Sequence, residues 1–328
     1  MRENELLSIE NLEIKYILRR STVNAVNGIS FTINKGERVG LVGETGAGKT
    51  TTALSILKLI PEPPGKITNG KIMLGGRNLM ETSEKEMRKI RGNDVSMVFQ
   101  DPMTSLSPVM TVGDQIMEVV LLHNDISKSE AALRAREMLE LVGIPGERYA
   151  EYPHQFSGGM KQRVLIAIAL ACNPKLLIAD EPTSALDVTI QAQVLELIAE
   201  LREKFNMSLL LITHDLGVVS ETCDRIMIMY AGRIVESGPV RTVYKNMQHP
   251  YTIGLFNSLP RLDIDTDRLE PIKGMMPDPA NLPAGCAFHQ RCPQAGERCA
   301  QELPPLTEME NGHCIACFHA IDKERSDG

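Results

Sequence analysis

The sequence has no apolar run that could cross a membrane as a helix, since no segment reaches about 18 uninterrupted apolar residues. Its first residues, MRENE, are too polar for a secretion signal. Positive charge is also scarce: 35 Lys and Arg face 42 Asp and Glu, a net charge of −7, which argues against nucleic acid as a partner. Low-complexity tracts and internal repeats are absent as well. These absences predict a soluble cytosolic chain, so any membrane-spanning part of its machinery must be another polypeptide.

A glycine-rich segment at residues 43–50, GETGAGKT, fits the phosphate-binding pattern G-x-x-x-x-G-K-[ST] at every fixed position. Residues 38–42 read as a short buried strand, and residues 51–60 carry apolar residues at helical spacing. A loop between such elements turns its backbone N–H groups into an anion-binding nest at the helix start. Lys49 would reach the β- and γ-phosphates, and the Thr50 hydroxyl would ligate Mg²⁺. A plain glycine turn gives no reason for Lys49, so we predict a nucleoside triphosphate site.

An apolar strand predicted from residue 175 onward ends in two carboxylates, Asp180 and Glu181. Asp180 would hold the Mg²⁺ through water, and Glu181 would orient and activate the attacking water. Two adjacent acids at a strand end also occur in solvated turns. Their position after a buried strand and downstream of the glycine loop favours the catalytic interpretation.

Two further segments carry polar groups beside apolar elements. Ser157, followed by Gly158 and Gly159, begins a strongly apolar helix; Ser157 is a good N-cap, and the glycines would let backbone amides approach an anion. We therefore predict a second phosphate-binding helix N-terminus. His214 ends the apolar strand at residues 209–213, and although a lone His is more often structural, this one ends a third neighbouring strand.

In order and spacing these segments resemble the complete motif set of an ATP-binding cassette (ABC) ATPase, over about residues 5–258. The resemblance implies that Gln100, after the apolar residues 95–99, is the Q-loop glutamine, which contacts Mg²⁺ and senses a transmembrane partner. It also implies a signature motif at Ser157, a D-loop at residues 184–187 and a switch histidine, His214, on the γ-phosphate.

The resemblance and the motifs together define a predicted site. The catalytic residues would be Glu181, His214 and Gln100, and the Mg²⁺ ligands would be Thr50, Gln100 and Asp180. Tyr16 stands where the family has an adenine-stacking aromatic; packing on its own sheet is the alternative. The nucleotide-binding residues would be Tyr16, Gly43, Glu44, Thr45, Gly46, Ala47, Gly48, Lys49, Thr50, Thr51, Ser157, Gly158 and Gly159.

The fold expected from the resemblance is α/β, with a P-loop NTPase-type parallel sheet core and an N-terminal antiparallel β region. A helical subdomain would be inserted at about residues 101–156. The nucleotide-binding domain would span residues 1–258, and a small Cys-rich extension residues 259–328. The length of 328 residues and the 43% hydrophobic content suffice for two domains.

Three segments are similar to the dipeptide and oligopeptide importers of this family: residues 100–113, the signature at residues 156–163 with its variant Met160, and residues 249–252 followed by 259–260. This branch implies a second ATPase subunit forming a heterodimer, two transmembrane permease subunits and an extracytoplasmic substrate-binding protein, with the chain peripheral on the cytoplasmic face of the membrane. In the family the signature of one subunit completes the P-loop site of the other. Nickel chelates and other small solutes are alternative cargoes. A soluble ABC ATPase of DNA repair or ribosomes, and an exporter ATPase, are the competing functions.

Cysteine is scarce outside the C-terminal tail, where five of the seven lie. Cys172 and Cys223 read as core residues. In a cytosolic chain a cysteine cluster indicates a metal site rather than disulfides. The tail resembles the extension of peptide importer ATPases, which implies a [4Fe–4S] cluster on Cys286, Cys292, Cys299 and Cys317. Cys314 is extra, and its CxxC spacing to Cys317 is one that zinc favours, so zinc and free, oxidisable thiols remain alternatives.

Overall fold

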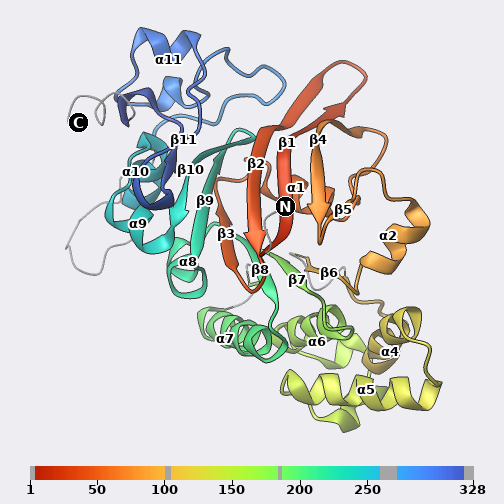
Figure 1. The fold of residues 1–328 in the computed structure, drawn as a ribbon. Helices are drawn as coiled ribbons and strands as arrows, with labels where there is room; N and C mark the ends of the chain where they lie inside the picture. The colour runs from red at the N-terminus through yellow and green to blue at the C-terminus, as the bar shows by residue number, and fades with distance from the viewer. Residues whose placement is uncertain (1–3, 100–104, 184–186, 259–271, 321–328) are drawn as a thin grey trace. The chain divides into compact units, whose positions relative to one another are not determined.

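The computed structural model describes residues 4–99, 105–183, 187–258 and 272–320, and the chain forms two compact units (Figure 1). The first unit comprises Met1–Leu6, Ile33–Arg38 and Gly75–Ile212, and the second comprises Leu7–Thr32, Val39–Leu74 and Thr213–Gly328. Each unit therefore combines segments that are distant in the sequence.

The first unit contains a parallel ladder of three short strands, β6 (Val95–Val98), β7 (Leu176–Asp180) and β8 (Ser208–Thr213). Leu177 of β7 pairs with Ser96 of β6 and with Leu209 of β8. Every residue of β7 and β8 is buried, which is why both strands read as continuous apolar runs. The predicted strands are confirmed.

Other elements of this unit are the short strand β5 (Arg77–Asn78) and a group of helices. The helices are α2 (Glu84–Ile90), α4 (Val112–His123), α5 (Lys128–Leu141), η1 (Gly146–Ala150), η2 (Pro153–Gln155), α6 (Gly158–Leu170) and α7 (Val188–Phe205). Helix α5 packs on α4 and α6, and α6 packs on α7 (Figure 1). The expected helical segment is confirmed for residues 105–156.

The buried face of α5 differs from the one that its large apolar residues suggest. From Leu133 onward these residues fit helical spacing poorly, and Leu133 is 59% exposed. The buried face consists of Ala131, Ala135, Met138 and Leu139, which have regular helical spacing. Small alanines, easily overlooked as core residues, define the packed face because neighbouring helices approach closely there.

The second unit has a sheet with the order β11 (Thr307–Glu308), β12 (Cys314–Ile315), β10 (Arg233–Pro239), β9 (Arg225–Tyr230) and β3 (Arg38–Val42). β3 runs parallel to β9, whereas β9 and β10 form a hairpin. Its turn residues, Ala231 and Gly232, both have positive φ, as a two-residue hairpin turn requires. In β12, Ile315 pairs with Glu236 of β10, so the cysteine tail adds strands to this sheet.

A second sheet in this unit is antiparallel and contains β2 (Thr22–Asn34), β1 (Glu5–Ile17) and β4 (Gly65–Leu74) in that order. Ile9 of β1 pairs with Ile72 of β4, and Tyr16 pairs with Gly65 near the strand end. The N-terminal β region is therefore confirmed.

The remaining elements of this unit are short: α1 (Lys49–Ile56), α8 (Leu216–Thr222), α9 (Val240–Lys245), α10 (Pro250–Asn257), η3 (His289–Arg291), α11 (Glu297–Gln301) and η4 (Glu310–Gly312). α1 ends earlier than the predicted 51–60 helix, because Lys58 adopts a left-handed conformation with φ of 49°. In the part of the chain that the structure describes, no helix has both the length and the apolar character of a membrane span.

Candidate functional site

The glycine-rich loop connects β3 to α1 and has the backbone that its glycines permit. Gly46 and Gly48 have φ of 86° and 104°, which disfavour any other residue type. At Gly43 the constraint is space, since a Cβ there would lie 2.2 Å from the carbonyl oxygen of Met229. The loop is therefore fixed between β9 and the start of α1.

Lys49 lies inside this loop and is only 7% exposed. Its Nζ donates to the carbonyl oxygens of Gly43, at 2.7 Å, and Glu44, at 3.2 Å. A phosphate placed in the loop would offer the ammonium stronger, charged acceptors. Thr45, Gly46 and Thr50 are exposed, as a ligand requires, whereas Ala47 is fully buried and serves packing.

Tyr16 lies beside the first turn of α1. Its hydroxyl is 3.5 Å from Thr51 Oγ1, and its ring lies against Gly65 of β4, where a Cβ would come within 3.2 Å. The half-buried ring therefore contacts both the P-loop helix and its own sheet. Both interpretations from the sequence retain support.

The two carboxylates lie at the end of β7 in the first unit. Asp180 is 2% exposed, and Glu181, half-buried, has a positive φ of 45°. The Glu181 N–H donates to the Ile212 carbonyl at 2.8 Å. This backbone bond turns the chain out of the sheet directly after Asp180.

His214 follows β8 and has an exposed side chain. The next residue, Asp215, caps α8 by accepting a bond from the Val218 N–H at 3.2 Å. Gln100 and residues 184–186 of the predicted D-loop lie outside the described residues, so their roles stay predictions.

Ser157, Gly158 and Gly159, the signature segment, lie at the start of α6 in the first unit. Ser157 and Gly158 are exposed, and Ser157 Oγ accepts the Met160 N–H at 3.4 Å. A Cβ on Gly159 would lie 2.6 Å from the Ile190 side chain of α7. Gly159 therefore also permits close helix packing, a role that the sequence did not indicate.

The tail brings four of its cysteines to one place. Cys286, Cys292, Cys299 and Cys317 line a small cavity, the four-cysteine pocket, together with Phe288, Phe318 and three histidines. Cys314 lies outside it: it is on β12, paired with Ser237 of β10. The predicted ligand set is thus the one that shares a pocket.

The pocket is largely desolvated. Burial raises the pKa of Cys286 to about 11, and the neighbouring cysteines Cys299, Cys317 and Cys292 raise it further. Burial likewise raises the pKa of Cys292 and Cys317. The Cys286, Cys292 and Cys317 thiols are therefore protonated at neutral pH when no metal is bound. Among the described residues, no group of three or more His, Cys, Asp or Glu side chains could hold a metal ion as arranged here.

The structure also reveals contacts of the P-loop that the sequence did not indicate. The Glu44 side chain, in the P-loop, pairs with Arg291 of the tail at 2.7 Å. The Glu44 N–H donates to the Tyr251 hydroxyl at 2.9 Å. Nothing in the sequence pattern pairs a loop glutamate with an arginine 247 positions away.

Two family models match the chain: an ABC transporter model over residues 26–184, and the C-terminal region of oligopeptide/dipeptide transporters over residues 235–299. The oligopeptide transport ATP-binding protein AppD of Bacillus subtilis is 52% identical over 315 residues, covering 95% of this chain and 96% of AppD. The dipeptide transport ATP-binding protein DppD of the same organism is 49% identical and covers 96% of this chain and 94% of DppD.

Solved structures agree with this assignment. The ATP-binding cassette MJ0796, a dimer in a post-hydrolysis state with ADP and Pi, has a TM-score of 0.65 at 28% identity, covering 72% of this chain and 99% of that one. The cbiO1 protein of Clostridium perfringens, part of an ABC transporter complex, has a TM-score of 0.64 at 26% identity, covering 77% and 96%. The chain is therefore an ABC ATPase and belongs to the family of oligopeptide/dipeptide transport ATP-binding proteins.

Proposed function

We propose that the chain is the ATP-hydrolysing subunit of an ABC importer that takes up dipeptides or oligopeptides. The observation that carries this proposal is a complete P-loop with a buried Lys49, in a chain similar over 95% of its length to an oligopeptide transport ATP-binding protein. The subunit would bind peripherally to the cytoplasmic face of the membrane. Its partners would be a second ATPase subunit in a heterodimer, two permease subunits and an extracytoplasmic binding protein.

Lys49 is the residue from which we infer the binding step. It would exchange the carbonyl oxygens of Gly43 and Glu44 for the β- and γ-phosphates, while the exposed Thr50 hydroxyl takes Mg²⁺. The loop glycines fit this role, because they keep Cβ atoms from displacing the backbone. Tyr16, beside Thr51, would face the adenine.

For hydrolysis, we assign one Mg²⁺ ligand and the general base to the end of β7. Asp180 would hold the metal together with Thr50 and Gln100, and Glu181 would orient the attacking water. His214 would contact the γ-phosphate. The exposed start of α6, with Ser157, would complete the nucleotide site of the partner ATPase rather than the site of its own chain.

We also assign the four-cysteine pocket to a [4Fe–4S] cluster. Four thiols around one cavity match the Cys₄ ligand set of such clusters. A single zinc ion needs all four sulfurs within about 2.3 Å of one centre, whereas a cluster distributes its thiolates over four irons. The resemblance of the tail to the C-terminal extension of peptide importer ATPases favours the cluster over zinc. Residues 259–328 would then be a metal-bearing extension of the nucleotide-binding domain at residues 1–258.

Glu181→Gln tests the catalytic assignment. ATP binding should persist while turnover falls by roughly 10²–10⁴-fold, the usual loss for a general base, and the ATPase pair should be trapped closed. The exposed Glu200→Gln on α7 is the matched control. Normal turnover in Glu181→Gln would overturn the assignment.

Spectroscopy and iron analysis of anaerobically purified protein test the cluster. A broad absorbance shoulder in the blue with bound iron supports it, and Cys292→Ser should remove the iron whereas Cys314→Ser should not. A colourless, zinc-bearing protein would refute it. Identification of the ligand held by the co-purified binding protein tests the cargo.

A further inference from the structure

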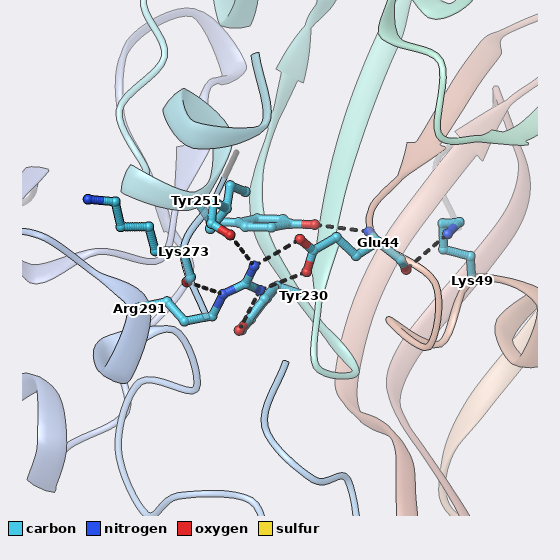
Figure 2. Close-up of polar contacts among 7 residues, drawn as sticks. Glu44, Lys49, Tyr230, Tyr251, Lys273 and Arg291 are labelled. Carbon is cyan, nitrogen blue, oxygen red and sulfur yellow. Dashed lines mark hydrogen bonds and ion pairs between the residues drawn. The ribbon is translucent and has the colours of Figure 1, made fainter. Parts of the chain in front are cut away.

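One ion pair joins the cysteine tail to the P-loop (Figure 2). Arg291 donates through both terminal nitrogens to the Glu44 carboxylate, at 2.7 and 3.1 Å. Its Nε donates to the Lys273 carbonyl at 3.1 Å, and one terminal nitrogen also reaches the Tyr230 hydroxyl at 3.3 Å. The guanidinium is thus held on all sides and fixes the carboxylate in one orientation.

The Arg291–Glu44 ion pair is largely buried, so the loss of one partner affects the other strongly. The Arg291 side chain is 6% exposed, and the Glu44 side chain is 29% exposed. The guanidinium also lies 5.8 Å from the centre of the Tyr230 ring and 5.9 Å from that of Phe288. Loss of one partner from such a pair leaves the other charge desolvated and uncompensated, so the remaining group must move toward water.

Glu44 connects this ion pair to the phosphate-binding groups. Its N–H donates to the Tyr251 hydroxyl, and its carbonyl accepts a hydrogen bond from Lys49 Nζ (Figure 2). The contact with Arg291 therefore restrains the same loop residue whose carbonyl oxygen positions Lys49. The Arg291–Glu44 pair therefore bears directly on the lysine that would meet the phosphates.

The backbone of Arg291 lies between two cysteines of the four-cysteine pocket. It lies in η3, between Cys286 and Cys292. The Cys292 N–H donates to the His289 carbonyl, and the His289 ring bonds to the Cys286 carbonyl at 2.8 Å. Arg291 thus occupies one short turn whose two ends are thiols of the four-cysteine pocket.

We propose that Arg291 is a positioning residue for the P-loop, and that through Glu44 it couples the state of the four-cysteine pocket to ATP affinity. The inference rests on the proposed function, since it requires that the P-loop binds ATP. A bound metal group would hold the Cys286–Cys292 turn, and with it Arg291, in the position seen here. Loss of that group would loosen the turn and weaken the hold on Glu44.

The first experiment measures ATP binding to the full-length chain by titration calorimetry with Mg²⁺. We expect Arg291→Met to weaken binding about tenfold, within the usual range of coupling between sites. Arg291→Lys keeps the charge but loses the bidentate geometry, so its ATP affinity should lie between those of the wild type and Arg291→Met. The double variant Glu44→Gln/Arg291→Met should recover part of the affinity, because no uncompensated carboxylate remains.

Arg88→Met is the matched control. Arg88 of α2 also forms an ion pair, with Glu84, but both side chains are exposed and neither contacts the P-loop or the four-cysteine pocket among the described contacts. Its loss should leave ATP affinity unchanged. Wild-type affinity in a folded Arg291→Met, or equal losses in both variants, would overturn the positioning role. If Arg291→Met does not fold, Arg291→Lys and the double variant decide by the same criteria.

A second experiment tests the coupling to the pocket. Cys292→Ser should lower ATP affinity in the wild-type background and have little further effect in Arg291→Met, because the link is already broken. Equal effects in both backgrounds would overturn the coupling. A wild-type chain that binds no ATP would refute the proposed function itself, a result distinct from any of these.

Discussion

The P-loop and the signature segment are both glycine-rich helix starts, yet the structure treats them differently. The P-loop exposes Thr45, Gly46 and Thr50, but contacts with distant parts of its own chain hold it: Lys49 is 7% exposed, Gly43 abuts Met229, and Glu44 is bound by Arg291 and Tyr251. The signature segment is exposed at Ser157 and Gly158, and its contacts within the described residues are with α6 and α7.

This difference fits the proposal that the P-loop binds ATP within its own chain, whereas the signature segment serves the nucleotide site of a partner ATPase. A loop that must grip phosphates benefits from being preorganised by contacts within its own chain, because ordering it then costs nothing on binding. A segment that serves another subunit must stay accessible. Substitutions that act on ATP affinity in the isolated chain should therefore separate the two segments.

The largest effect is expected at Lys49. Lys49→Ala removes the charge that would meet the phosphates and should weaken ATP binding by about 100-fold, or ~3 kcal/mol. Filter binding or calorimetry measures it. Lys161→Ala, in the first turn of α6, is the counterpart and should leave the affinity of the isolated chain unchanged; equal losses would erase the distinction between the segments.

The glycines sharpen the comparison next. A methyl group on Gly43 would meet a backbone carbonyl oxygen at 2.2 Å, whereas one on Gly159 would meet the Cγ2 methyl of the Ile190 side chain at 2.6 Å. A backbone carbonyl cannot rotate away from a clash as a side chain can. Gly43→Ala should therefore cost about 2–3 kcal/mol of unfolding free energy and most of the ATP affinity. Gly159→Ala should cost about 1 kcal/mol and no affinity. Denaturant melts with binding assays test both; a milder effect at Gly43 would contradict the packing argument.

Tyr16 decides between adenine stacking and sheet packing. If the ring stacks on the base, Tyr16→Ala should weaken ATP binding by about tenfold, because such stacking contributes roughly 1–3 kcal/mol. Tyr16→Phe should leave ATP affinity almost unchanged, since the only polar contact of the Tyr16 hydroxyl within the described residues is the long one to Thr51 Oγ1, at 3.5 Å. Loss of stability without loss of affinity in Tyr16→Ala would assign the ring to packing alone.

Ser157→Ala should have the smallest effect on the isolated chain. ATP affinity should not change, and unfolding free energy should fall by about 1 kcal/mol through loss of the N-cap. Ser127→Ala removes a comparable cap from α5 and serves as control. In the assembled ATPase pair only Ser157→Ala should slow hydrolysis; if Ser127→Ala slows it equally, the effect is one of helix stability.

Much of the fold was predictable from local sequence. The strands β3, β7 and β8 appear as apolar runs because they are buried on both faces, and the P-loop is recognisable because its glycines and lysine are required at fixed positions. The sequence predicted least well those features that depend on small residues or on the backbone conformation of a single residue. The end of α1 depends on a left-handed Lys58, and the packed face of α5 depends on two alanines.

The cysteine tail shows an intermediate case. Family resemblance selected Cys286, Cys292, Cys299 and Cys317, and these four share one pocket. The exclusion of Cys314 follows from the pairing of β12 with β10, which directs that residue to Ser237. A pairing between strands about 80 residues apart cannot be read from the spacing of cysteines within the tail.

The sequence by itself determined that this chain has a P-loop, its accompanying ABC motifs and a cysteine-rich tail, because each depends on residue types at short, fixed separations. Only the tertiary structure decided that the P-loop glutamate would meet Arg291, that four thiols would share a cavity, and that Gly43 would abut Met229. Those contacts join residues far apart in the chain, so they arise from the packing of β3, β9 and the tail, and no local pattern encodes them.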